Sequence, residues 1–208
     1  MRKAIAFLCI VLFSIAAVGC DSGKNTSTVA GHIFSSSDVY SLLKIPPTED
    51  ASFRSIPVAR EGEVVVYYGG WNIDQLEQAY GEDIAWWYQI SKEEVQKWPT
   101  PKIGYYRVVF SIPGTKGLNY EEQTKVLHEI KPDFEPAPAL VAITAFLAHN
   151  KATHSLPPGR VASYVYHRCR ETLPEGARAH IALEKEMKYP LLRFDYQHQT
   201  LAATKYCP

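Results

Sequence analysis

The sequence of 208 residues lacks any run or stripe of basic residues, and its 22 lysines and arginines balance its 22 aspartates and glutamates. Proteins that bind nucleic acids use basic patches to displace counterions from phosphates. We therefore expect no nucleic-acid partner for this chain.

Familiar catalytic and cofactor-binding motifs are absent as well. The sequence has no phosphate-binding loop, no glycine-rich dinucleotide fingerprint, no Gly-x-Ser-x-Gly elbow and no His-Glu-x-x-His zinc motif. We expect no cofactor and no bound metal. The common enzyme classes are disfavoured, whereas an enzyme with an unfamiliar site is still compatible with the sequence.

No hydrophobic run is long enough to span a bilayer. The uncharged stretch at residues 4–18 has fifteen residues, which as a helix measure about 22 Å against about 30 Å of hydrocarbon. Arg2 and Lys3 precede this stretch, and the small residues Ala17 and Gly19 end it. A basic tip, an apolar core and small residues before a cut site are the three parts of a secretory signal.

Residues 17–20 (Ala-Val-Gly-Cys) resemble the lipobox of bacterial lipoproteins, with alanine where leucine is usual. The resemblance implies that residues 1–19 are removed and that Cys20 carries the lipid that anchors the chain to a membrane. Asp21 resembles the enterobacterial signal for retention in the inner membrane, which predicts the periplasmic face of that membrane, with the outer membrane as the alternative. The competing interpretation is ordinary cleavage after Gly19.

Residues 20–31 form a lipidated cysteine followed by a small, polar segment without hydrophobic periodicity. As a flexible coil this tether would span about 18 Å. The remaining residues 32–208 are enough for one globular domain of ordinary size.

Cysteine is scarce. Apart from the lipidation candidate Cys20, which precedes the domain, only Cys169 and Cys207 remain after the signal. In an oxidising periplasm these two are a natural disulfide. The bridge would close a separation of 38 residues and stabilise the fold by about 2–4 kcal/mol. Two unpaired thiols are the alternative.

Local patterns predict an α+β domain with a mainly antiparallel sheet packed against several helices. Apolar periodicity and capping residues predict helices near residues 39–43, 73–80, 91–98, 119–130 and 137–152. The helix at 137–152 is the most apolar and is expected at the centre of the core. β-Branched and aromatic runs predict strands at 64–68, 105–112, 161–169, 179–183 and 191–196. The last two strands would form a hairpin, although residues 178–188 are also compatible with a helix.

Aromatic residues cluster around two short segments. Trp71 follows Gly69-Gly70, and Trp86, Trp87 and Tyr88 are consecutive. Neighbouring tryptophans cannot both enter one core from a regular strand, and aromatic side chains suit both sugars and protein hot spots. Core packing is the first explanation for most of these side chains. These four residues are the candidate binding surface, because the neighbouring glycines would let a ligand or partner backbone approach closely.

Three histidines are the candidate general bases. His149 and His154 end the apolar helix, and His167 lies two residues from Cys169. Five residues rotate a helix by about 140°, which points the first two imidazoles in different directions. A catalytic carboxylate would have to come from elsewhere, such as Asp133 or Glu135.

Two functions of different class are compatible with these observations. The leading hypothesis is a lipid-anchored envelope protein that binds a protein or glycan without catalysis, as an assembly factor, inhibitor or immunity protein. The alternative is an envelope hydrolase of peptidoglycan or peptide that uses a histidine base.

Overall fold

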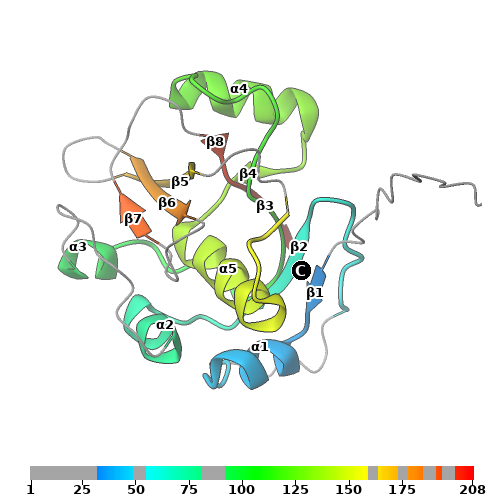
Figure 1. Ribbon diagram of the computed structural model, residues 1–208, viewed down its shortest axis with the longest axis vertical. Coiled ribbons are helices and arrows are strands. Elements are labelled where there is room, and N and C mark those ends of the chain that lie inside the picture. The colour runs from blue at the N-terminus through cyan, green and yellow to red at the C-terminus, as the bar shows by residue number, and fades with distance from the viewer. Residues whose placement is uncertain are drawn as a thin grey trace, which may run out of the picture.

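The computed structural model describes residues 32–48, 55–80, 92–158, 164–172, 178–184, 191–193 and 200–208 (Figure 1). The predicted signal, Cys20, Asp21 and the tether lie outside these residues, as do Trp86, Trp87 and Tyr88. In the described residues, no helix has the length and apolar character needed to cross a bilayer.

The larger sheet has five strands in the order β1-β2-β3-β9-β4. The edge strand β1 pairs with β2 in parallel, and all the other pairs are antiparallel. All of β2 and β3 is buried, as their β-branched and aromatic composition predicts. The strands are β1 (His32–Phe34), β2 (Val64–Tyr68), β3 (Gly104–Val109), β4 (Glu135–Pro136) and β9 (Ala203–Cys207).

The smaller sheet has the order β7-β6-β5-β8 and is antiparallel except for the β5–β8 pair. Ala202 joins the two sheets, because its amide donates to the Arg168 carbonyl at 3.0 Å and its own carbonyl accepts from the Ala137 amide at 2.9 Å. The strands are β5 (Tyr164–Thr172), β6 (Arg178–Glu184), β7 (Leu191–Arg193) and β8 (Thr200–Leu201).

Five helices surround and fill these sheets in the described part of the chain. Capping boxes begin three of them as reciprocal hydrogen bonds: Ser35 with Asp38 at α1, Asn72 with Gln75 at α2, and Asn119 with Glu122 at α4. The helices are α1 (Ser36–Leu43), α2 (Ile73–Tyr80), α3 (Lys92–Gln96), α4 (Tyr120–Ile130) and α5 (Ala139–Thr153).

Helix α5 lies at the centre of the molecule (Figure 1) and contacts strands of both sheets. Every residue from Ala139 to His149 is buried. A helix that is apolar on all sides fits only a position enclosed by other elements. Its one hydroxyl in this stretch is satisfied, because Thr144 Oγ1 donates to the Leu140 carbonyl at 2.7 Å.

The fold is therefore α+β with a mainly antiparallel sheet, as the sequence predicts. The stretch that was compatible with either a strand or a helix is β6, and it forms the expected antiparallel pair with β7. The C-terminal strand β9 was not predicted. It inserts between β3 and β4 and thereby places the end of the chain inside the larger sheet.

Candidate binding groove

Trp71 is part of the core and not of a binding surface. Its side chain is 0% exposed, its indole Nε1 donates to the Pro46 carbonyl at 2.8 Å, and its ring packs against Tyr68. A Cβ at Gly69 would lie 2.6 Å from the indole ring, so glycine is needed for this close packing. Trp71 therefore packs in the core beside β2, which is the first explanation that the sequence offers for its aromatic residues.

The three candidate histidines lie in three different surroundings. His149 is buried, and its ring meets the ring of His32 at a centroid distance of 4.5 Å. His154 is exposed and ends α5 in the left-handed conformation with φ of 52°. His167 is buried, with its ring 5.6 Å from that of Phe110.

The environment of His149 disfavours its charged form. Burial lowers the pKa of His149, and the neighbouring charge of His32 lowers it further, against a weaker effect of the Ser155 carbonyl. Among the described residues, no group of three His, Cys, Asp or Glu side chains could hold a metal ion.

Cys169 and Cys207 are free thiols in the structure, so the disulfide expected from the sequence is not formed there. Cys169 is buried in β5 of the smaller sheet, whereas Cys207 is partly exposed in β9 of the larger sheet. Burial raises the pKa of both thiols, which disfavours the reactive thiolate.

A groove of about 640 Å³ opens at the edge of the larger sheet, and we call it the edge groove. Four segments that are distant in the sequence meet there: β3 with the loop before it, the loop around β4, β5 and β9. The lining residues are Pro99, Thr100, Pro101, Lys102, Tyr106, Asp133, Glu135, Pro136, Pro138, Arg170, Thr204, Lys205 and Tyr206.

The strand register places the edge groove beside the central helix. Phe34, Val66 and Tyr106 are successive register partners, and so share one face of the sheet. Phe34 contacts His149 of α5, so this is the face that α5 covers. Tyr206 is the partner of Tyr106 on the same face. The groove therefore lies near the N-terminal end of α5, where Pro138 is the N-cap.

Tyr106 and Tyr206 line the edge groove from adjacent strands, with ring centroids 5.2 Å apart. Their hydroxyls donate to the carbonyls of Lys102 at 2.8 Å and Ile103 at 3.1 Å. Burial and the neighbouring Tyr206 raise the pKa of Tyr106 to about 12, against opposing effects of Arg170 and the Lys102 carbonyl. Tyr106 therefore keeps its proton at neutral pH and holds the loop before β3 in place.

Four prolines stiffen the walls: Pro99 and Pro101 before β3, and Pro136 and Pro138 in and after β4. Proline fixes φ near −65° and has no amide to donate. Pro136 lies in the edge strand β4, which is where a sheet tolerates proline. These walls therefore lose little entropy when a ligand binds.

Charged side chains of both signs line the mouth. Lys205 Nζ pairs with Asp133 at 3.0 Å, and His128 Nε2 lies 3.4 Å from Glu135. Lys102 Nζ lies 5.8 Å above the Tyr206 ring and forms no ion pair with any described residue. The fifth charged residue, Arg170, is exposed.

Arg170 connects the edge groove to a buried carboxylate. Its Nη2 lies 3.3 Å from Glu171 Oε1, and Glu171 Oε2 accepts the Ala139 amide at 2.8 Å. Glu171 thus supplies the cap that Pro138 cannot give to α5. Burial raises the pKa of Glu171, and the opposing effects of the Ala139 amide and of Arg170 are smaller.

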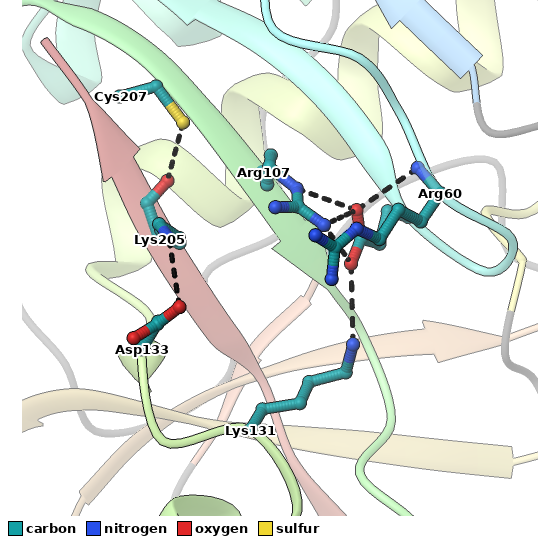
Figure 2. A network of polar contacts seen from close by, with 7 residues as sticks. Arg60, Arg107, Lys131, Asp133, Lys205 and Cys207 are labelled. Carbon is teal, nitrogen blue, oxygen red and sulfur yellow. Dashed lines mark hydrogen bonds and ion pairs between the residues drawn. The ribbon is translucent and has the colours of Figure 1, made fainter.

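The opposite face of the larger sheet holds a second buried carboxylate (Figure 2). Glu63 is 0% exposed and forms a two-point pair with Arg107, at 2.8 Å from both Nε and Nη2. It also accepts from the Arg60 amide at 3.1 Å and pairs with Lys131 at 3.3 Å. We call these four residues the Glu63 cluster. Phe134 covers it, with Lys131 Nζ 4.8 Å above the ring.

No protein-family model matches the chain, and neither a curated protein nor a solved structure matches it. Its chemistry therefore has to be read from the site.

Sequence reasoning found only parts of this site. Asp133 and Glu135 were considered as carboxylates, but as partners of a histidine base. In the structure Asp133 pairs instead with Lys205, which follows it by 72 positions. The prolines at 99, 101, 136 and 138 are the signal that was available, since each pair lies beside a strand of the larger sheet.

Proposed function

We propose that this chain is a lipid-anchored protein of the bacterial envelope that binds an extended segment of a partner protein in the edge groove. The observation that carries the proposal is the groove itself: about 640 Å³ in volume, with rigid proline walls, two tyrosines and charges of both signs. Sites of this size with an apolar lining and a few polar groups are typical ligand sites.

The lining favours a peptide over a sugar. Sugar-binding aromatics offer an open ring face, but Tyr106 is only 5% exposed and its hydroxyl is bonded to the Lys102 carbonyl. Prolines and tyrosines lining a groove are instead suited to extended peptide backbone and its side chains. The charged mouth adds groups that can select among peptides.

The N-terminal segment supplies the address in this proposal. Lipidation at Cys20 would hold the domain at the membrane surface, and the tether at 21–31 would let it reach a partner about 18 Å away. A Cys20→Ser variant is expected to lose labelling with a palmitate analogue. Labelling that persisted in this variant would contradict lipidation at this residue.

Site-specific photo-crosslinking in living bacterial cells tests the proposal. Thr100 is an exposed residue of the groove wall and is replaced by a photo-reactive phenylalanine in the full chain. Tyr40, exposed on α1, is the matched control position. We expect one protein adduct from position 100 and none from position 40, with the attached peptide identified by mass spectrometry.

A groove-filling variant decides whether that adduct reports binding in the groove. Thr204→Trp adds bulk to the groove lining and should abolish the adduct from position 100. Thr204 is buried, so circular dichroism and a urea titration must first show that the variant folds. No adduct in the parent chain, or an adduct that a folded Thr204→Trp chain keeps, would contradict the proposal.

A further inference from the structure

The charges at the mouth of the edge groove are unequally matched. Lys205 is neutralised by Asp133, and Glu135 has His128 beside it. Two cationic groups are left at the mouth: Lys102, which forms no ion pair with a described residue, and Arg170, whose acidic neighbour is Glu171. Lys102 and Arg170 therefore offer positive charge to an occupant at the mouth of the groove.

The backbone of Arg170 is fixed from both sides, which positions its side chain. Its amide donates to the Ala137 carbonyl at 2.9 Å, and its carbonyl accepts from Arg178 Nη1 at 2.6 Å. Arg178 is itself held over the Tyr120 ring at 3.8 Å. The Arg170 side chain is 45% exposed, so most of its donors are open to a ligand.

Glu171 satisfies Arg170 only weakly. The contact of 3.3 Å is long for a charge-assisted hydrogen bond, and the other oxygen of Glu171 is committed to the Ala139 amide. Glu171 thus leaves the remaining donors of the guanidinium unused. An external carboxylate would bind the open edge of the guanidinium without breaking the cap of α5.

Lys102 lies where it can share such a carboxylate. Its backbone is fixed by the hydroxyl of Tyr106, and its ammonium group is held near the Tyr206 ring. Arg170 lines the same groove as Tyr106 and Lys102. Lys102 and Arg170 therefore bring two cations from separate segments to the groove that the two tyrosines line.

We propose, resting on the function proposed above, that the partner segment carries an acidic side chain whose carboxylate is bound between Lys102 and Arg170, with flanking apolar residues against Tyr206 and the prolines. The carboxylate belongs to an Asp or Glu of a protein. The acidic stem peptide of peptidoglycan, which offers the same chemistry, is an outcome that the test distinguishes.

Selection from a displayed library of random 12-residue peptides tests this inference, with the full-length chain in detergent as the target. We expect the selected peptides to share one Asp or Glu beside apolar residues. Calorimetry then compares a selected peptide with its Asn or Gln counterpart. The amide peptide should bind about tenfold more weakly, the loss expected for one partly exposed charge-assisted contact.

Variants of the chain form a double-mutant cycle with the two peptides. Lys102→Gln combined with Arg170→Gln should weaken binding of the acidic peptide about tenfold and leave binding of the amide peptide unchanged. When Arg170 is replaced by Lys instead of Gln, part of the affinity for the acidic peptide should be kept, because lysine retains the positive charge. Lys116→Gln, an exposed lysine outside the groove, should change neither affinity.

The outcomes separate the inference from the function on which it rests. Peptides without an acidic residue, or equal loss for both peptides in the double variant, would overturn the inference alone. Competition by a peptidoglycan stem peptide at equal affinity would overturn the assignment to a protein segment. If the library yields no peptide whose binding is lost in the Thr204→Trp chain, the proposed function itself is contradicted.

Discussion

The larger sheet has a buried glutamate near each of its faces, and the two are held in opposite ways. Glu63 receives hydrogen bonds from Arg107, Lys131 and the Arg60 amide, all within its own cluster (Figure 2). Burial alone would raise its pKa, but these bonds and the charge of Arg107 outweigh burial and lower it. Burial raises the pKa of Glu171, and the Ala139 amide, Arg170 and its own backbone amide oppose this without outweighing it.

This difference separates a structural region from a binding region. In the Glu63 cluster the cations are directed at a carboxylate inside the protein, and Phe134 covers them. At the edge groove, Lys102 and Arg170 are exposed beside a hollow. Charges that are satisfied internally stabilise the fold, whereas charges that face an open groove are available to a partner.

The largest expected effect is that of Glu63→Gln. The change leaves Arg107 buried without its anionic partner, so we expect a loss of about 3–5 kcal/mol in the free energy of unfolding. Urea denaturation measures the loss. Glu61→Gln, at an exposed position two residues away, is the control and should change stability by less than about 0.5 kcal/mol. Equal stability of the Glu63→Gln and wild-type chains would contradict the structural role of the Glu63 cluster.

The pH dependence of stability should have opposite signs at the two glutamates. The pKa of Glu63 is lowered in the fold, so its stabilisation is present above pH 4.5 and is lost as the pH falls through the folded pKa. Glu171 has a raised pKa, so its contribution is full below pH 4.5 and is lost as the pH rises through the folded pKa.

Unfolding measured from pH 3 to 7 in three chains separates these contributions. Relative to wild type, the Glu63→Gln chain should be less stable mainly above the pKa that Glu63 has in the fold. The free energy of unfolding of the Glu171→Gln chain should rise relative to wild type as the pH rises through the folded pKa of Glu171. Differences between chains remove the contribution of His149, whose lowered pKa makes stability fall below pH 6.5 in all three. Parallel pH curves for all three chains would contradict the assigned shifts.

Glu171→Gln should have a much smaller effect on stability at neutral pH. The glutamine oxygen can still accept the Ala139 amide, and the cost of burying a charge is removed. We expect a change within about 1 kcal/mol of wild type, measured in the same urea titration. A loss as large as that of Glu63→Gln would show that the two carboxylates are equivalent after all.

The smallest effect on stability is expected for Lys102→Gln. Its side chain is exposed and forms no ion pair with a described residue, so the free energy of unfolding should stay within about 0.5 kcal/mol of wild type. Differential scanning calorimetry checks this value. A larger loss would mean that Lys102 belongs to the structural framework, as the Glu63 cluster does.

What the sequence predicts here is mostly local. The capping box of Asn119 and Glu122 and the apolar run of β2 are written within a few neighbouring residues, and both are present. The hydrogen-bond partner of buried Trp71 could not be predicted, because the sequence does not say that Pro46, 25 positions earlier, accepts its indole hydrogen. The cap of α5 comes from Glu171, 32 positions away.

The edge groove could not be predicted for the same reason. Its walls come from four separate segments, and its second tyrosine lies in β9, a strand that pairs with residues about 100 positions earlier. Only the fold shows that Tyr206 is beside Tyr106 and that Arg170 lines the same edge groove.

Amide hydrogen exchange of the full-length chain with and without a selected acidic peptide tests the central claim most directly. We predict slower exchange on binding at residues 100–103, 170 and 204–206, and unchanged exchange at 60–63 and 131. Protection at the Glu63 cluster, or none at the edge groove, would contradict the claim that one region is structural and the other binds the partner.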